Sequence, residues 1–503
     1  MIESIISTFQ DFRNRLFLLF PYRRDATMDL IDAVSAETST SIVKLSLSDL
    51  FRRKYSSITD VLDSLFRSNL KTPSTQDDLV KQKLKVTQLL AEKCPQSQKN
   101  GFALFAIDCS ANPRIFADKV PDRTIVHAPN HVPGQKPITV GHEYSVLVHL
   151  PSDPIDRELH WVIPLSTRRV QSNESGPQVG LAQLEEIATA TVFRDQFCVS
   201  VTDAAYGTQR WIIGVSKLPN VVNIARMRSN RKVYRLPPQE GQKKKGRPLI
   251  YGEEIPLSAP PQPDLQEITT VTTRKGHIHQ VRLDRWNDII VRGSDKERTH
   301  EHPFDLVRVT VIDGKGKPVY KRPLWVMVTG ARRREVTSFQ AFDSYCRRYD
   351  IEHFFRFGKQ KLGLVNSQTC DTCHEEGWHW IALLAYSMLY HARQLAQSTA
   401  YPWEKKRVRV IAPNQRPSQV QRDYKRIIRG IGTPASIPKP RGKSPGRQLG
   451  AQVPQRPICD LIYKKNNESK PKPLTKSSPA KRRTQCLRMR RVWNKDRPAP
   501  MRC

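Results

Sequence analysis

The sequence lacks any apolar run long enough to cross a membrane. Of its 503 residues 38% are hydrophobic, yet no stretch approaches the roughly 20 apolar residues that a membrane-spanning helix needs. The apolar N-terminal segment is interrupted by Asp11, Arg13 and Arg15, whereas a signal peptide requires an uninterrupted apolar core. We therefore expect a protein of the cytoplasm that has no membrane partner.

Cysteine is scarce, and its number is odd. Nine Cys residues in a chain without a secretion signal predict free thiols in a reducing compartment. Cys370-x-x-Cys373-His374 matches a haem-attachment pattern and also half of a zinc site. Covalent haem would need export and a distal ligand, and zinc would need a second ligand pair, although His379 is close. We interpret the segment as a polar loop between two helices, with metal binding as the alternative.

Acidic residues are too few to balance the basic ones. The chain has 48 Asp and Glu against 83 Lys and Arg, which gives a net charge of +35. Such an excess attracts polyanions and favours nucleic acid as a partner. Most of it lies in residues 401–503, which are also rich in proline. Because such a composition buries little apolar surface, we expect a basic, partly disordered tail that lies on DNA phosphates or simply aids solubility.

Two short apolar runs end in aspartate. F-A-L-F-A-I-D ends at Asp108, and F-C-V-S-V-T-D ends at Asp203. Runs of this length and composition are typical of buried strands. An Asp at the end of a strand often only stabilises a turn, so neither residue alone indicates a site.

A polar group with the spacing of one helical face follows further along the chain. Tyr345, Arg348, Glu352 and Lys359 fall within about 60° of one another at about 100° per residue, and an apolar strip lies beside them. A solvated face with ion pairs would give the same pattern. Together with the two aspartates upstream, however, Glu352 completes a candidate triad of carboxylates.

This combination resembles the DDE transposases of bacterial insertion sequences, in the group with the Tyr-x2-Arg-x3-Glu-x6-Lys signature. The resemblance covers roughly residues 101–400 and extends to I-D-C-S, V-T-D-A-A-Y-G and E-E-G-W-H-W-I-A-L-L-A-Y-S-M-L. It implies an enzyme that cleaves DNA strands at transposon ends and then joins the freed 3′ hydroxyl to target DNA.

The chemistry of such a reaction suits the three carboxylates. Two divalent ions about 3.5 to 4 Å apart activate the nucleophile and the leaving group, and hard Mg²⁺ prefers carboxylate oxygens. We expect Asp108, Asp203 and Glu352 to hold two Mg²⁺ ions, for which Mn²⁺ can substitute. By the resemblance, Tyr345, Arg348 and Lys359 bind DNA phosphates near the cleaved end.

The resemblance also implies partners and a location. The DNA partners are the terminal inverted repeats of the element and the target DNA, both double-stranded. Two ends must be held together during transposition, so a homodimer on DNA is expected. The expected location is the bacterial cytoplasm, in association with the nucleoid.

The middle of the chain has segments in the order of a ribonuclease-H-like fold. S-V-L-V-H-L and W-V-I-P-L read as strands, and G-L-A-Q-L-E-E-I-A-T-A reads as a helix. The 148 residues between Asp203 and Glu352 exceed what one more strand and a helix need. N-V-V-N-I-A-R-M-R and D-L-V-R-V-T-V-I-D therefore indicate a β-rich insertion, after which R-P-L-W-V-M-V-T-G returns to the main sheet.

The predicted fold class is α/β, with a ribonuclease-H-like mixed sheet flanked by helices, a β-rich insertion, a helical N-terminal domain and the basic tail. The predicted domains are a helical DNA-binding domain, the first part of the catalytic domain, the insertion, the second part of the catalytic domain and the tail, at residues 1–98, 99–211, 212–322, 323–400 and 401–503.

Three further features are candidates for DNA contact. A helix-turn-helix divided near Ser56 would let Arg52, Arg53 and Lys54 reach the terminal repeats, although a structural helical bundle would look the same. In K-K-K-G-R-P, Arg247 would enter a narrow minor groove, or else the segment is a plain basic loop. Trp325 would stack on an unpaired base, but its apolar neighbours L-W-V-M-V favour burial.

Two other classes of function remain alternatives. One is a catalytically inactive or domesticated transposase-derived protein that binds DNA without cutting it. The other is a basic structural nucleic-acid binder, which accounts for the tail but leaves the spacing from Tyr345 to Lys359 unexplained.

Overall fold

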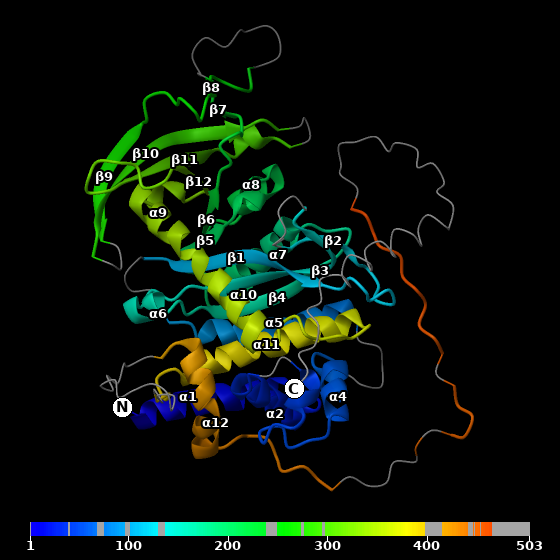
Figure 1. The fold of residues 1–503 in the computed structure, drawn as a ribbon. Coiled ribbons are helices and arrows are strands. Elements are labelled where there is room, and N and C mark those ends of the chain that lie inside the picture. Colours follow the sequence, from blue (N-terminus) through cyan, green and yellow to red (C-terminus); the bar gives the residue numbers. More distant parts are fainter. Residues whose placement is uncertain are drawn as a thin grey trace, which may run out of the picture. The chain divides into compact units, whose positions relative to one another are not determined.

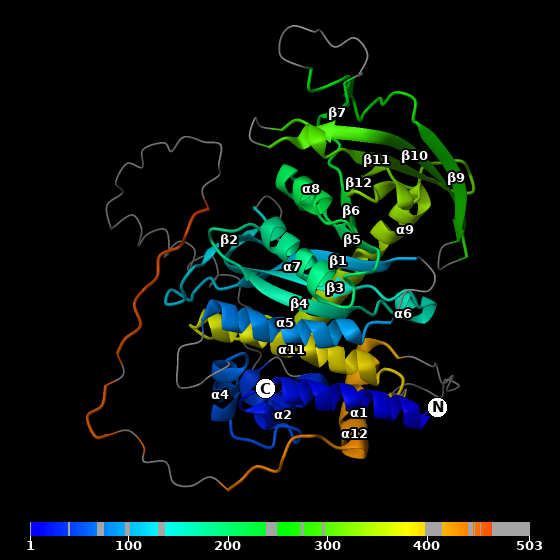
Figure 2. The same ribbon diagram turned by 180° about the vertical axis from the view of Figure 1, so that it is seen from behind.

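A mixed β-sheet organises the computed structural model (Figures 1 and 2). The structure describes residues 2–38, 41–67, 75–95, 101–128, 136–237, 249–272, 276–293, 297–397, 415–440, 446, 448–452 and 454–464. The predicted minor-groove segment with Arg247 and most of the predicted tail therefore lie outside the described residues. Among the described residues, no helix has the length and apolar character needed to span a membrane.

The sheet has a parallel centre with antiparallel strands on both sides. Its path runs β2-β3-β1-β5-β6-β12-β11-β10-β7-β8, while β4 pairs with β3 and β9 pairs with β10. Strands β1, β5 and β6 are parallel neighbours. The strands are β1 (Ala103–Pro113), β2 (Thr124–His127), β3 (Ile138–His149), β4 (Ile163–Val170), β5 (Cys198–Thr202), β6 (Val221–Arg226), β7 (Val233–Arg235), β8 (Glu254–Ile255), β9 (Leu265–Thr272), β10 (Ile278–Val291), β11 (Phe304–Ile312) and β12 (Leu324–Thr329).

The central strands follow from their apolar composition. All five residues of β5 are buried, as are the first five of β6, which is typical of parallel strands covered on both faces. The predicted strands in S-V-L-V-H-L and W-V-I-P-L overlap the end of β3 and the start of β4, and the predicted helix lies within α7 (Gly176–Ala190). These local predictions are confirmed.

One strand differs from its predicted place. N-V-V-N-I-A-R-M-R was assigned to the insertion, but it forms β6, which lies beside β5 in the parallel centre. Strand β12 then pairs with β6 on one side and with β11 on the other. Strands β7 to β11 therefore extend the central sheet itself. Residues of this part of the sheet form a second apolar cluster that includes Trp286, Phe304 and Trp325.

Helices cover both faces of the sheet near β1. Neighbouring residues of a strand point to opposite faces. Asp108 contacts a residue at the start of α10, whereas Cys109 faces Gly176 at the start of α7. The helices after β1 are α6 (Pro154–Glu158), α7, α8 (Gln209–Ser216), α9 (Ser338–Arg347), α10 (Tyr349–Lys361), α11 (Thr372–Ala392) and α12 (Pro417–Ile431), with short 3-10 helices η1 (Ala204–Tyr206), η2 (Thr299–Glu301) and η3 (Arg333–Glu335).

Helix α11 lies between the sheet and a layer of N-terminal helices (Figure 1). Nearly all of its residues from Gly377 to Tyr390 are buried, as expected for a helix that is apolar on all sides. It packs on β4 on one side and on α2 and α12 on the other. The helices of this layer are α1 (Ile2–Leu19), α2 (Arg24–Ala36), α3 (Ile42–Leu45) and α4 (Ser56–Ser64), whereas α5 (Gln76–Glu92) packs on β4 itself.

The predicted helix-turn-helix around Ser56 does not form. Helix α4 begins at Ser56, but the residues before it are not helical, and α3 is a single turn that ends at Leu45. Arg52 and Arg53 in this non-helical segment both bind the buried carboxylate of Asp29. The prediction was wrong because the spacing of apolar residues does not reveal these tertiary ion pairs.

Part of the predicted basic tail is a packed helix. Helix α12 buries Val420, Tyr424, Ile427 and Ile428 on one face. The Tyr424 hydroxyl donates to Asp32 (3.0 Å) and accepts a hydrogen bond from the buried Arg13 (3.1 Å). For residues 417–431, the expectation of a disordered tail is therefore wrong.

Candidate active site

Asp108 and Asp203 lie on neighbouring parallel strands at the same level. Ala106 of β1 pairs with Val201 of β5, so each aspartate stands two residues beyond this pair. Strands are about 4.8 Å apart, which brings the two carboxylates to one place on the sheet. Asp203 follows β5 directly, as predicted. Asp108 does not end its strand, because β1 continues to Pro113 by pairing with β3 alone.

Local hydrogen bonds orient both carboxylates. Asp108 Oδ1 accepts the backbone N–H of Cys109 at 2.8 Å. Asp203 Oδ1 accepts the backbone N–H of Ala205 at 2.8 Å and thereby caps η1. Each aspartate uses one oxygen for this local bond.

The predicted signature helix is interrupted at one residue. Tyr345 belongs to α9, Glu352 and Lys359 belong to α10, and Arg348 stands at the junction. The backbone of Arg348 keeps right-handed helical angles (φ −51°, ψ −30°), so the chain bends without losing the helical spacing. A buried ion pair between Arg347 and Asp350 (3.2 Å) fixes this bend. The prediction of one continuous helix is wrong at this residue.

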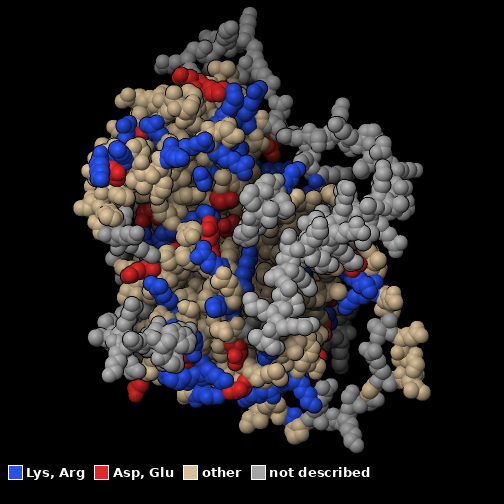
Figure 3. All heavy atoms as spheres, viewed as in Figure 1, with Lys and Arg blue, Asp and Glu red and all other residues tan. Residues whose placement is uncertain are grey.

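Arg348 joins two of the three predicted carboxylates. Its Nη1 donates to Asp108 Oδ2 at 3.0 Å, and its Nη2 donates to Glu352 Oε1 at 2.6 Å. The same guanidinium therefore connects β1 with α10 and offers one positive charge to two carboxylates. On the face seen in Figure 3, Asp and Glu side chains gather near the middle of the view, and Lys and Arg side chains crowd the surface over β10 to β12.

The carboxylates interact electrostatically. Burial raises the pKa of Asp108 to about 6, and the negative charges of Asp203 and Glu352 act in the same direction, against the lowering effect of Arg348. Carboxylates that share a site raise one another's pKa in this way. Such a crowded group of acids is typical of sites that bind cations or catalyse reactions.

Tyr345 and Lys359 lie beside this group. Burial raises the pKa of the half-buried Tyr345, while the positive charges of Arg348 and Arg226 lower it. Burial lowers the pKa of Lys359, and the charge of Asp108 acts against this effect. The structure thus gathers all six predicted residues of the triad and the signature. Their roles stay predictions.

A comparison with protein families identifies the chain. A family model described as DDE superfamily endonuclease matches residues 15–288, more than half of the sequence. The chain belongs to this family. The match includes Asp108 and Asp203 and ends before α9, so the role of Glu352 depends on the signature and the geometry. The comparison with curated proteins found no match.

Enzymes of the DDE endonuclease family act on DNA and generally use divalent metal ions. In the described part of this DDE endonuclease, no group of three His, Cys, Asp or Glu side chains is arranged to hold a metal. The cation between Asp108 and Glu352 is instead the Arg348 guanidinium. Three carboxylates are nevertheless a suitable donor set for Mg²⁺, so the residues fit the ion if Arg348 moves away.

In this endonuclease, two of the arginines predicted to contact DNA bind groups of the protein itself. Arg52 donates to Asp29 (2.7 Å) and to the carbonyl of Ala435 (3.0 Å), and Arg53 pairs with the same Asp29 (3.2 Å). Lys54 is exposed. DNA contact by these three residues stays a prediction, but both arginines already hold the helical layer together. Trp325 is buried at 3% exposure, as predicted.

Only part of the cysteine motif lies in the predicted polar loop, because Cys373 and His374 belong to the first turn of α11. Asp371 accepts the N–H groups of Cys373 and His374 at the start of α11, and His374 pairs with Asp63 (2.5 Å). Cys370 stands in the preceding loop. Among the described residues this motif forms no metal cluster.

Two groups near the site are not evident from the sequence. The first is a pocket of about 610 Å³ beside Asp203, which contains four arginines. The second is the buried Glu375, which accepts hydrogen bonds from Asn112 (2.8 Å), Arg114 (2.9 Å) and Tyr144 (3.1 Å) and pairs with His142 (2.9 Å). It fixes α11 to β1 and β3. Arginines and an acid at unrelated sequence positions carry no local signal, so only the fold reveals these groups.

Proposed function

We propose that this DDE endonuclease is a DNA transposase with a ribonuclease-H-like catalytic domain. It hydrolyses strands at the terminal inverted repeats of its element and joins the freed 3′ hydroxyl to target DNA, as a dimer. The observation that carries the proposal is the sharing of one guanidinium by Asp108 and Glu352 beside Asp203. A metal-binding triad requires three carboxylates at one place, and here they come from β1, from the end of β5 and from α10.

In this proposal Asp108, Asp203 and Glu352 hold two Mg²⁺ ions. When bound, these ions activate the attacking oxygen and stabilise the leaving oxygen. Arg348, once released from the carboxylates, offers its planar fork to a DNA phosphate. Lys359 adds a point charge from the half-buried face of α10. The two basic groups position DNA and neutralise its charge.

The signature supports the finer assignment. Tyr345, Arg348, Glu352 and Lys359 keep the Tyr-x2-Arg-x3-Glu-x6-Lys spacing of insertion-sequence transposases, and Arg348 and Glu352 pair at a separation of four residues, as neighbours on one helical face do. The net charge of +35 fits a protein that holds long stretches of DNA.

The test is cleavage of supercoiled plasmid that carries the flanking terminal repeats, with Mg²⁺ or Mn²⁺. We expect Asp108→Asn and Glu352→Gln to abolish cutting and to keep most of the affinity for the repeats. The matched control is Glu185→Gln, which neutralises an exposed carboxylate on α7, on the other side of the sheet. If the wild type binds the repeats and cuts nothing with either ion, the alternative of an inactive DNA-binding protein replaces the proposal.

A further inference from the structure

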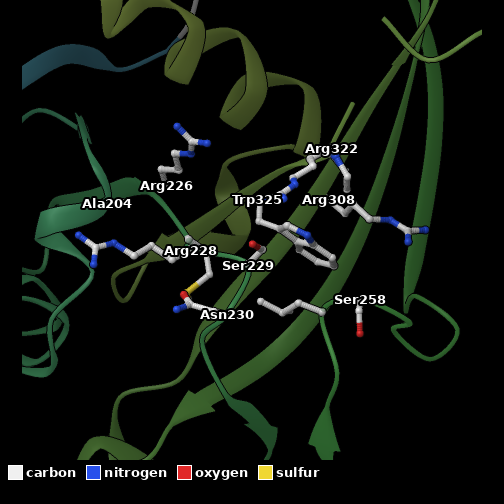
Figure 4. A pocket seen from close by; sticks show the side chains of 12 residues that line it. Ala204, Arg226, Arg228, Ser229, Asn230, Ser258, Arg308, Arg322 and Trp325 are labelled. Carbon is white, nitrogen blue, oxygen red and sulfur yellow. The ribbon is translucent and has the colours of Figure 1, made fainter. Parts of the chain in front are cut away.

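An arginine-lined pocket adjoins the proposed catalytic carboxylates. It has a volume of about 610 Å³, and Ala204, which directly follows Asp203, forms part of its wall. Figure 4 shows Trp325 in the wall, with Arg226 and Arg228 on one side and Arg308 and Arg322 on the other. The positive side chains come from β6 and the segment after it, from β11 and from the segment before β12.

Three of these arginines have no acidic partner within the described part of the chain. Arg308 is neutralised, because it donates twice to Asp284 (3.0 and 2.7 Å). Arg226, Arg228 and Arg322 are exposed, and no ion pair with a described carboxylate involves them. Burial lowers the pKa of nearby Arg231, and the positive charge of Arg228 acts in the same direction. The pocket thus concentrates positive charge that no described acid compensates.

The tryptophan in the wall is not available to stack on a base. Trp325 is 3% exposed and packs against Trp286 with the ring centres 5.4 Å apart. The guanidinium of Arg308 lies over its ring at 5.9 Å. Because its faces are already covered, the pocket offers a ligand charge and hydrogen-bond donors more than an aromatic surface. Its chemistry suits an anion.

The DNA hydrolysis proposed for the adjacent carboxylates produces one specific anion. When water hydrolyses a DNA phosphodiester and frees a 3′ hydroxyl, the water oxygen bonds to phosphorus and the bond from phosphorus to O3′ breaks. O3′ takes up a proton, and the other fragment keeps a 5′-phosphate. A terminal phosphate carries a charge of about −1.5 to −2 at neutral pH, whereas an internal phosphodiester carries one charge.

We propose that this pocket binds the 5′-terminal phosphate of a cut DNA strand. Arg226, Arg228 and Arg322 provide planar donors for a group that is nearly doubly charged, at the side of Asp203 where the strand is cut. The enzyme then holds its 5′-phosphate product and prefers such an end over a 5′-hydroxyl end. This assignment rests on the proposed function, because the proposed cleavage produces the 5′-phosphate.

The experiment measures binding of one short DNA duplex, made with a 5′-phosphate or a 5′-hydroxyl end, to the full chain by fluorescence anisotropy. EDTA is present, so cleavage does not interfere. We expect the wild type to bind the phosphorylated end about tenfold more tightly, since each tenfold step needs only about one good charge-assisted hydrogen bond. Inorganic phosphate at millimolar concentration should reduce this preference.

The double variant Arg226→Gln/Arg322→Gln should bind both ends with nearly equal affinity. The control Arg194→Gln removes an exposed arginine in the segment before β5, at the end of the strand opposite to Asp203, and should keep the preference. Equal binding of both ends by the wild type would overturn the proposal. So would a double variant that weakens both complexes by the same factor, because the arginines would then serve only the DNA backbone in general.

Failure of the proposed function gives a different result. Plasmid cleavage that depends on Glu352, without any preference for the 5′-phosphate, would overturn the pocket assignment alone. A preference that disappears in the double variant, in a wild type that cuts no DNA, would support the pocket as a 5′-phosphate site and reject the transposase.

Discussion

The Arg348 guanidinium donates a 3.0 Å hydrogen bond to Asp108, although 240 positions separate the two residues in the sequence. The same group also binds Glu352 at 2.6 Å. A cation that belongs to the chain therefore holds together two of the acids that we assign to metal binding. If these acids bind a divalent ion as proposed, the ion must compete with Arg348 for the same oxygens in the free protein.

This competition predicts that Arg348→Gln binds Mn²⁺ more tightly than the wild type when no DNA is present. The variant keeps a polar side chain of similar length but loses the charge. Mn²⁺ then no longer has to displace a guanidinium from the carboxylates. We expect a gain of about tenfold, which corresponds to roughly 1.4 kcal/mol, measured by isothermal titration calorimetry.

The control for this prediction is Arg356→Gln, which removes an exposed arginine from the same helix and should leave the Mn²⁺ affinity nearly unchanged. Unchanged or weaker Mn²⁺ binding by Arg348→Gln would show that the guanidinium does not compete with the ion. DNA cleavage by Arg348→Gln should still fall, because the variant lacks the guanidinium that we propose binds a DNA phosphate.

Asp108 makes the stability of the metal-free protein depend on pH. Its pKa of about 6 in the folded state exceeds the value of about 3.9 for an unfolded chain, so the folded protein binds the proton more tightly. This favourable contribution is complete below about pH 4 and is lost as the pH rises through 6.

Asp108→Asn imitates the protonated acid and should therefore stabilise the protein at pH 8 by about 3 kcal/mol. At pH 4 the difference in the free energy of unfolding should nearly vanish. Urea unfolding in EDTA at the two pH values measures both. A variant less stable than the wild type at pH 8 would contradict the raised pKa of Asp108.

Glu375 should show the opposite pH dependence. Burial alone would raise its pKa, but the hydrogen bond from His142 and the positive charges around it lower the pKa to about 2. A carboxylate with a lowered pKa stabilises the folded state above the unfolded pKa of about 4.3 and loses this effect as the pH falls toward 2.

Glu375→Gln should cost about 3 kcal/mol of unfolding free energy at pH 7, since it leaves Arg114 buried without a charged partner. The cost should shrink at pH 3. Glu376→Gln, one position along α11, removes a partly exposed acid that pairs with Lys83 and should cost less than about 1 kcal/mol. A pH-independent cost for Glu375→Gln would indicate a loss of packing alone.

The sequence predicts the central strands well because their signal is local. Continuous apolar residues are sufficient to identify β5 and β6 as strands, and the aspartate after β5 marks the end of that strand. They did not place β6 in the centre of the sheet, because that depends on its pairing with β5. The prediction that Asp108 ends its strand was wrong, because β1 continues beyond its parallel partner β5. The residues after Asp108 pair only with β3, and they show no continuous apolar run in the sequence. Register with a distant strand is a tertiary property.

The candidate site could be predicted only in part for a similar reason. The spacing of Tyr345, Arg348 and Glu352 is a local helical pattern, so it is visible in the sequence. The ion pair from Arg348 to Asp108 and the gathering of Arg226 with Arg322 depend on how distant segments pair in the sheet. Likewise, the pattern of the four buried apolar residues of α12 is obscured by the basic residues between them.

Arg52 was predicted to contact DNA, and the structure gives it an internal role that can be measured separately. Its bonds to Asp29 and to the Ala435 carbonyl connect the segment before α4 to α2 and to the residues after α12. Arg52→Ala should lower the free energy of unfolding by about 2 kcal/mol, because Asp29 is buried. Lys54→Ala, at an exposed position, should change it by less than about 0.5 kcal/mol.

DNA affinity then distinguishes the two roles of this segment. If Arg52 serves the fold, Arg52→Ala binds the terminal repeats with nearly wild-type affinity at temperatures where it remains folded. A tenfold loss of affinity without a loss of stability would support the DNA contact predicted from the sequence.

Helix α12 should be essential for folding, whereas the residues after 464 should matter mainly for charge. The aromatic ring of Tyr424 is fully buried, and its hydroxyl connects Arg13 with Asp32. Tyr424→Ala should therefore cost about 3 to 5 kcal/mol, as large aromatic deletions in cores do. The control is Lys425→Ala, which removes a neighbouring half-exposed side chain that pairs with Asp49. It should lower the free energy of unfolding by less than about 1 kcal/mol.

A chain that ends at residue 464 keeps α12 and loses a segment rich in Lys and Arg. Its melting temperature should stay within a few degrees of the full chain, while its affinity for DNA should fall and depend less steeply on salt, because fewer phosphate contacts release fewer counterions. A salt dependence equal to that of the full chain would mean that DNA binding lies entirely within residues 1–464, and that the terminal basic segment serves solubility instead.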